Sequence, residues 1–351
     1  MKKAFLYAYD RQNLGDDLFV HTITGRYPDT QFYMWSDAKN KEVFACLPNL
    51  KVIDKDSRFM HLLNKLRPSL VSRYKGMIEE RCDAVVYIGG SIFMEYPNWE
   101  TICTWWDWTA KNRPFYVLGA NFGPYHTEGY RERMAKIFAN CRDVCFRDRY
   151  SAGLFPGIVR QAPDILFSFC MPKPSVQEDQ VFVSVINCAG RDESHDLKAH
   201  DARYVANMAG LLRQLLDSGK KLVLASFCKD EGDEEGIRKI LAALGGQNDP
   251  RIRTLFYDGT NADQLTHAIA ASGGVIATRF HATILAMAAG RPVLPILYSD
   301  KTRHVLEDLG FEGVVYDLRE DNPWPAAEMT AATAPAAGSA GHFEKLDQIL
   351  K

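Results

Sequence analysis

The sequence predicts an α/β protein with two domains, each built on a parallel β-sheet. Short apolar runs typical of buried strands alternate with helix-length segments along most of the 351 residues, which is the pattern of repeated βαβ units. Two prolines in the segment 170–175 interrupt the alternation once, and it then begins again. We therefore expect an N-terminal domain over 1–172 and a C-terminal domain over 176–330. Residues 331–351 should form an irregular segment followed by a C-terminal helix.

Each half of the chain supplies its own series of strands and helices. The first half has six strand-like runs: Ala4–Tyr9, Gln31–Trp35, Lys51–Ile53, Ala84–Ile88, Phe115–Leu118 and Val144–Phe146. The second half has five: Val181–Ile186, Lys221–Phe227, Ile252–Tyr257, 275–278 and Val293–Tyr298. Helices are expected between them, for example at 127–140, 201–216, 233–244, 262–271 and 282–289, where apolar residues recur at helical spacing or strong helix formers gather.

Composition excludes several classes of function. A formal net charge of −2 gives no reason to expect nucleic acid as a partner. No apolar run approaches the ~18 residues that a membrane-spanning helix needs. The eight cysteines are scattered without a CxxC pair, and no Cys/His spacing suggests a metal. We expect a cytoplasmic protein with reduced thiols, no metal and no cofactor, with peripheral attachment to the inner face of the membrane left open.

The most informative stretch is Thr278–Ile296, which places Arg279 and His281 at a strand-to-helix turn. In parallel sheets, ligands bind at the carboxyl ends of strands, where helix N-termini direct free N–H groups at anions. An anionic ligand is therefore expected beside these two side chains. The alternative is a buried arginine and a packed histidine with no ligand.

The first half carries polar and glycine-rich strand ends. Asn13, Gly15, Asp16 and Asp17 follow the first strand, where Gly15 would permit unusual backbone conformations and the carboxylates could cap a helix or face a sugar hydroxyl. Three further candidates for a ligand-facing surface follow the fourth and fifth strands: the Gly89–Gly90 pair, Ser91 and Asn121.

Two more cations stand at strand ends. Arg147 directly follows a strand and could present its planar fork to a carboxylate or phosphate. Lys301 follows the strand after the Arg279–His281 helix and could serve as a point charge for phosphate. A weak surface ion pair between Arg147 and Asp148, and a solvated loop lysine, are the alternatives.

Together these residues resemble the polysaccharide pyruvyl transferase family. The resemblance rests on the early Asn-x-Gly-Asp at 13–16, the Gly-Gly turn, Arg147-Asp148 followed by Ser151, Pro163-Asp164, and Arg279-x-His281 leading to Lys301. It covers most of the chain. Two positions depart from the family pattern: Ser91 stands where a third glycine is common, and Thr278-Arg-Phe-His replaces Ser-Arg-Leu-His.

The resemblance implies a GT-B-like fold of two Rossmann-like domains facing across a cleft. It also implies transfer of a pyruvyl group from phosphoenolpyruvate to a sugar of a cell-surface polysaccharide or its precursor, forming a cyclic ketal and releasing phosphate. The N-terminal domain would hold the acceptor and the C-terminal domain the donor. The donor would be bound by Arg147, Arg279, His281 and Lys301. Catalysis would use His281 as general acid, with Asp16, Asp17 or Asp148 as base. Asn13, Gly15, Asp16, Gly89, Gly90, Ser91 and Asn121 would bind the acceptor.

Two other functions compete with this one. A GT-B glycosyltransferase would use the same helix N-terminus for a nucleotide-sugar diphosphate. A non-catalytic carbohydrate-binding protein could share the fold, although the four cationic or titratable side chains argue against it. The acceptor sugar, its lipid-linked or nucleotide-linked form, and the oligomeric state stay open.

Overall fold

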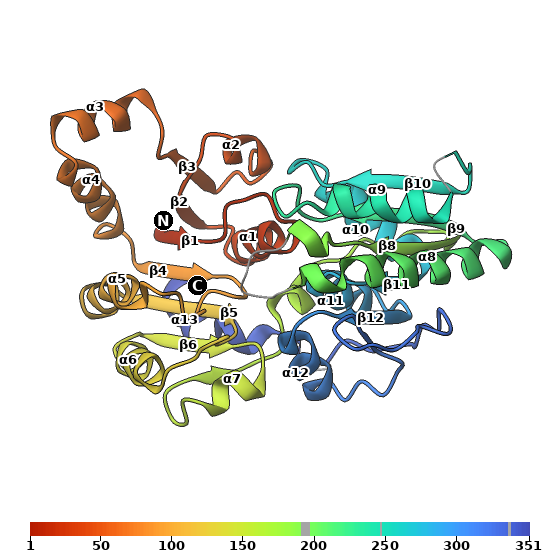
Figure 1. Ribbon diagram of the computed structural model, residues 1–351. Coiled ribbons are helices and arrows are strands. Elements are labelled where there is room, and N and C mark those ends of the chain that lie inside the picture. The colour runs from red at the N-terminus through yellow and green to blue at the C-terminus, as the bar shows by residue number, and fades with distance from the viewer. Residues whose placement is uncertain (191–196, 246–247, 336–337) are drawn as a thin grey trace. The chain divides into compact units, whose positions relative to one another are not determined.

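The computed structural model describes residues 1–190, 197–245, 248–335 and 338–351, which form two compact units (Figure 1). The first comprises Met1–Asp10, Asp16–Ser168 and Ala337–Lys351. The second comprises Phe169–Ala336 and the short segment Arg11–Gly15. Each unit is an α/β structure with one parallel sheet, so the predicted fold class is confirmed.

The first unit has a seven-stranded sheet in the order β3-β2-β1-β4-β5-β6-β7, with every neighbouring pair parallel. Its strands are β1 (Lys2–Tyr7), β2 (Thr30–Ser36), β3 (Leu50–Asp54), β4 (Ala84–Ile88), β5 (Phe115–Ala120), β6 (Asp143–Phe146) and β7 (Arg160–Gln161). Its helices are α1 (Leu14–Arg26), α2 (Asn40–Val43), α3 (Arg58–Leu66), α4 (Ser69–Glu79), α5 (Trp99–Asn112), α6 (Glu128–Phe138) and α7 (Arg149–Gly153). The strand order reverses direction between β1 and β4.

The second unit repeats this arrangement with six parallel strands in the order β10-β9-β8-β11-β12-β13. The strands are β8 (Glu178–Ser184), β9 (Lys221–Ser226), β10 (Ile252–Phe256), β11 (Ser272–Ala277), β12 (Val293–Leu297) and β13 (Tyr316–Asp317). The helices are α8 (Asp201–Asp217), α9 (Asp233–Leu244), α10 (Ala262–Ala271), α11 (Phe280–Ala288) and α12 (Asp300–Asp308). Here the order reverses between β8 and β11. Both sheets therefore have the strand order of a Rossmann fold.

Burial explains why the strands read as continuous apolar runs rather than as alternating patterns. All residues of β5, β6 and β12 are buried, because helices cover both faces of a parallel sheet. Local signals set the helix starts: Thr127 accepts a hydrogen bond from Tyr130 N at the start of α6, and Asp148 accepts one from Ser151 N at the start of α7.

The C-terminal segment packs on the first unit. The 3₁₀ helix η4 (Ala340–Phe343) and α13 (Glu344–Leu350) bury Phe343, Leu346 and Leu350. Asp347 pairs with Arg26 at 2.6 Å and accepts a hydrogen bond from the Tyr27 hydroxyl at 2.7 Å. The final helix is thus held by polar contacts as well as by its apolar face.

Candidate functional site

The sequence-predicted residues gather at the carboxyl ends of strands, around the two points where strand order reverses. In the first unit, β1 and β4 lead into Asp16 and Gly89–Ser91. In the second, β11 leads into the Thr278–His281 turn, beside the end of β8. Such switch points are where open α/β sheets bind ligands, since the loops on either side diverge and leave a crevice.

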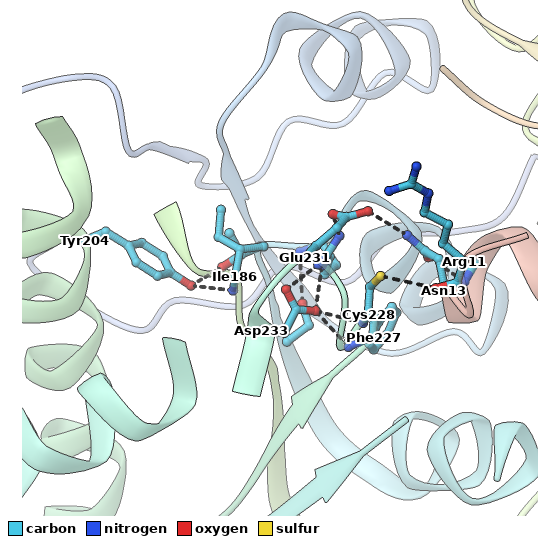
Figure 2. Close-up of polar contacts among 12 residues, drawn as sticks. Arg11, Asn13, Ile186, Tyr204, Phe227, Cys228, Glu231 and Asp233 are labelled. Atoms are coloured by element: carbon cyan, nitrogen blue, oxygen red, sulfur yellow. Dashed lines mark hydrogen bonds and ion pairs between the residues drawn. The ribbon is translucent and has the colours of Figure 1, made fainter. Parts of the chain in front are cut away.

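Arg279 lies at the N-terminus of α11, and two carboxylates hold its guanidinium. Its Nε donates to Asp233 at 2.9 Å, a second nitrogen bonds the other oxygen of Asp233, and a third bonds Glu231. The same Asp233 accepts the backbone N–H groups of Phe227 and Cys228 at 2.9 and 3.0 Å (Figure 2). Burial alone would lower the pKa of Arg279, but the two carboxylates more than offset it and raise that pKa above its ordinary value.

This geometry changes how Arg279 can act. The cluster contains one positive and two negative charges, so it is not a simple cationic patch. A guanidinium has five N–H donors. Three of them are taken by Asp233 and Glu231. Arg279 is therefore as much a brace between the β9–α9 loop and the start of α11 as a group available to a ligand.

Hydrogen bonds from neighbouring elements also fix the turn that carries Arg279. Ser184, at the end of β8, accepts a hydrogen bond from Arg279 N at 3.1 Å. The Tyr204 hydroxyl accepts one from Ile186 N at 3.3 Å and lies 3.1 Å from the hydroxyl of Thr278 (Figure 2). Burial raises the pKa of the Tyr204 hydroxyl, so it remains neutral and keeps its proton. Thr278, which replaces the serine of the family pattern, thus retains a hydroxyl with a partner.

The early Asn-x-Gly motif packs directly on this site. Leu14 N donates to the Phe227 carbonyl at 3.0 Å, and Asn13 reaches Glu231 at 3.4 Å (Figure 2). A Cβ built on Gly15 would lie 1.7 Å from Nδ1 of His281. Two motifs far apart in the sequence therefore meet, and the backbone of Gly15 lies against the imidazole ring.

Gly15 does not adopt the unusual backbone conformation that its position in the sequence predicted. Its φ does not lie in the left-handed region, unlike that of Gly119 or Gly123. Glycine is required here because any side chain would collide with His281.

Lys301 stands in the first turn of α12, after β12. Its Nζ lies 5.5 Å from the centroid of the Tyr298 ring, and Tyr298 itself is buried. Because β12 pairs with β11, this lysine belongs to the same sheet edge as Arg279 and His281.

Arg147 belongs to a second cluster, in the first unit. Arg147 is 2% exposed, and its guanidinium donates to Asp164 at 3.2 Å and to the Asn121 side-chain oxygen at 2.7 Å. The Ser91 hydroxyl donates to that same oxygen at 3.3 Å, and a Cβ on Gly90 would lie within 2.8 Å of the guanidinium. Arg147 and Asp148 are both buried and Asp148 caps α7, so the alternative of a solvent-exposed surface pair does not apply.

The cluster joins residues that the sequence assigned to different ligands. Arg147, expected at the donor, lies with Gly90, Ser91 and Asn121, expected at the acceptor. Burial raises the pKa of the Asp164 carboxyl, and the nearby Arg147 only partly opposes this shift. Conversely Asn13 and Gly15, expected at the acceptor, lie with Arg279 and His281.

Two of the candidate bases differ in accessibility. Asp16 and Asp17 both lie in the first turn of α1, where a carboxylate is favourable. Asp17 is fully buried, whereas Asp16 is partly exposed. Asp16 is therefore the better placed of the two to meet a substrate hydroxyl.

The sequence did not predict that Glu231 and Asp233 belong to the site. The Lys-Asp-Glu-Gly-Asp run at 229–233 has no metal or catalytic spacing, and it reads as a solvated loop before a helix. The available signal was indirect: a buried arginine after β11 requires carboxylates, and Asp233 follows the nearby strand β9.

Within the described residues, no group of His, Cys, Asp and Glu is arranged to hold a metal ion. None of the helices in the described ranges has the length and apolar character to cross a bilayer.

Comparison with known proteins assigns the family. The model of the family described as polysaccharide pyruvyl transferase matches residues 13–300, which span both units and both clusters. The chain belongs to this family. The match begins at Asn13, the residue that contacts Glu231, and ends just before Lys301.

One curated relative is the amylovoran biosynthesis protein AmsJ of Erwinia amylovora. It is 21% identical over 263 residues, which cover 68% of this chain and 62% of the relative. The alignment thus spans less than two thirds of that protein's length.

Solved structures share the fold. The UDP-GlcNAc 2-epimerase of Methanocaldococcus jannaschii aligns with a TM-score of 0.56 at 11% identity, covering 99% of this chain and 100% of that one. Anabaena Alr3699/HepE in complex with UDP-glucose aligns with a TM-score of 0.55 at 14% identity, covering 90% and 85%. At this identity the likeness concerns architecture alone.

Proposed function

We propose that the protein transfers the pyruvyl group of phosphoenolpyruvate to two hydroxyls of a sugar, forming a pyruvate ketal and releasing phosphate. The observation that carries the proposal is the family match across the residues that build the His281 turn. The name of the relative AmsJ supports a role in making a polysaccharide or its precursor.

The proposed reaction needs an acid near the donor. Protonation of the methylene carbon of phosphoenolpyruvate makes carbon 2 electrophilic, and one acceptor hydroxyl adds there. Phosphate then leaves, and the second hydroxyl closes the ketal. We assign the proton donor to His281, which lies in the first turn of α11 beneath Gly15. A positioned general acid contributes ~10²–10⁴-fold to rate.

The cations around His281 would receive the anionic groups of the donor. We assign Lys301 to the phosphate as a point charge. Arg279 would contribute the N–H groups that Asp233 and Glu231 leave over, while those carboxylates fix its plane. Asp16 is our candidate for the base that accepts the hydroxyl proton, because it is partly exposed.

The first-unit cluster is proposed to serve the acceptor. Ser91 and Asn121 present a hydroxyl and an amide, which suit sugar hydroxyls, and Arg147 holds Asn121 in place from beneath. The sequence led us to expect that Arg147 binds the donor directly. We propose instead that Arg147 supports the polar surface that binds the acceptor. A cytoplasmic setting fits the proposal, since the eight cysteines, all of which lie in the described ranges, are not joined in disulfides.

Replacement of His281 by glutamine tests the assignment. Glutamine retains hydrogen bonding but supplies no acidic proton, so phosphate release from phosphoenolpyruvate should fall by ~10²–10⁴-fold, while donor affinity stays within roughly tenfold. A thermal-shift measurement tests the competing glycosyltransferase function, because only the true donor raises the melting temperature of the protein strongly. Stabilisation by a nucleotide sugar and not by phosphoenolpyruvate would reject the proposal.

A further inference from the structure

The hairpin of helices α3 and α4 presents an apolar face to solvent. In Figure 1 the two helices stand off the sheet of the first unit between β3 and β4. Ser57 caps α3 by accepting a hydrogen bond from Met60 N, and Met60 is buried. Phe59, Leu62 and Leu66, at positions i, i+3 and i+7, are 51%, 55% and 68% exposed. Helical spacing places these three large side chains on one face.

The charge around this face has one sign. From Ser57 to Ile78 the sequence contains five lysines or arginines and no aspartate or glutamate, although the whole chain has a net charge of −2. Arg58, Lys65, Arg67 and Arg73 are all exposed. On the helical wheel of α3, Arg58 and Lys65 flank the apolar stripe on its solvent side.

We propose that α3 lies in the surface of an anionic lipid bilayer, with Phe59, Leu62 and Leu66 inserted and the basic residues at the headgroups. A short helix with an apolar face and a lysine- and arginine-rich border is the form that binds membrane interfaces. Anionic headgroups complement this border. A second copy of the chain does not, because the same basic border would face itself. The proposal is independent of the reaction assigned above.

Sedimentation of the protein with vesicles tests the proposal. The protein is mixed at low salt with vesicles of phosphatidylglycerol and phosphatidylcholine, or of phosphatidylcholine alone. Binding should require phosphatidylglycerol and should weaken as salt is raised. The double variant Arg58→Glu/Lys65→Glu should lose at least roughly fivefold in affinity for each position. Leu62→Ser/Leu66→Ser should lose more than about tenfold at unchanged charge.

Matched controls separate this surface from general effects. Val176→Ser removes an apolar side chain that is 70% exposed, and Lys136→Glu reverses an exposed charge on α6. Both should bind vesicles like the parent protein. The proposal fails if the parent binds neither vesicle, or if the controls lose as much as the α3 variants. It also fails if the α3 variants bind normally or alter only the oligomeric state.

Discussion

Replacement of Gly15 by alanine should disable His281 without unfolding the protein. An alanine methyl group would lie 1.7 Å from His281 Nδ1, whereas ordinary contact begins at 3.4 Å, so the ring or the start of α1 must move by about 1.7 Å. Overpacking of this kind costs ~1–3 kcal/mol of stability. Displacement of a catalytic group by about 1 Å can cost ~10²-fold in rate, and a complete loss of the acid ~10²–10⁴-fold.

Gly25 provides a control in the same helix. A Cβ there meets nothing within 4 Å. Gly25→Ala should therefore leave turnover unchanged and stabilise α1 by up to ~1 kcal/mol. The assays are phosphate release from phosphoenolpyruvate with a panel of glycans, and urea unfolding. If Gly15→Ala matches Gly25→Ala in both, the contact between the two motifs does not position the histidine, and the reasoning is refuted.

Three further changes probe buried charges by urea unfolding. Asp233→Asn should lower the free energy of unfolding by ~3–5 kcal/mol, because it leaves the buried Arg279 with only part of its compensating charge. Asp164→Asn should cost a similar amount, since Arg147 is equally buried. Burial lowers the pKa of His342 to about 3, so this group contributes stability above its unfolded pKa of ~6.5 that is lost as the pH falls toward 3. At pH 5 the loss should be about 2 kcal/mol, and His342→Gln should remove that pH dependence.

Exposed ion pairs supply the controls for these changes. Glu235→Gln breaks a solvent-exposed pair with Arg238, and Glu344→Gln breaks one with Arg160 in which the carboxylate is exposed. Each change should lower the free energy of unfolding by no more than ~1 kcal/mol. Equal losses for Asp233→Asn and Glu235→Gln would show that the buried cluster contributes nothing beyond a surface contact. If the His342→Gln variant loses as much stability at low pH as the parent protein, groups other than His342 cause that loss.

The sequence predicts the sheets well because their strands are buried on both faces. Ala84–Ile88 is the observed β4, and the predicted runs at 115–118 and 293–298 fall within or overlap β5 and β12. The edge strands β7 and β13 have two residues each, too few to produce an apolar run. The α3–α4 hairpin was also missed, since its apolar residues are partly exposed and no core explains them.

The sequence points to several residues of the candidate site but not to the contacts between them. Arg279 and His281 stand out locally because a charged turn follows an apolar strand. Their partners come from distant loops: Gly15 from the first strand end, and Asp233 from the end of β9. Only the folded sheet brings these loops together, so the brace formed by two carboxylates could not be seen in a linear pattern.

In the proposed reaction, the pyruvyl group of phosphoenolpyruvate becomes a ketal on a sugar, with His281 as the acid. NMR of glycan acceptors after incubation with phosphoenolpyruvate labelled at its methylene carbon tests this most directly. We expect a new ketal methyl signal to appear with an equal amount of phosphate, and to be nearly lost in His281→Gln. A sugar transferred from a nucleotide donor with no ketal methyl, or a ketal formed equally well by His281→Gln, would contradict the account.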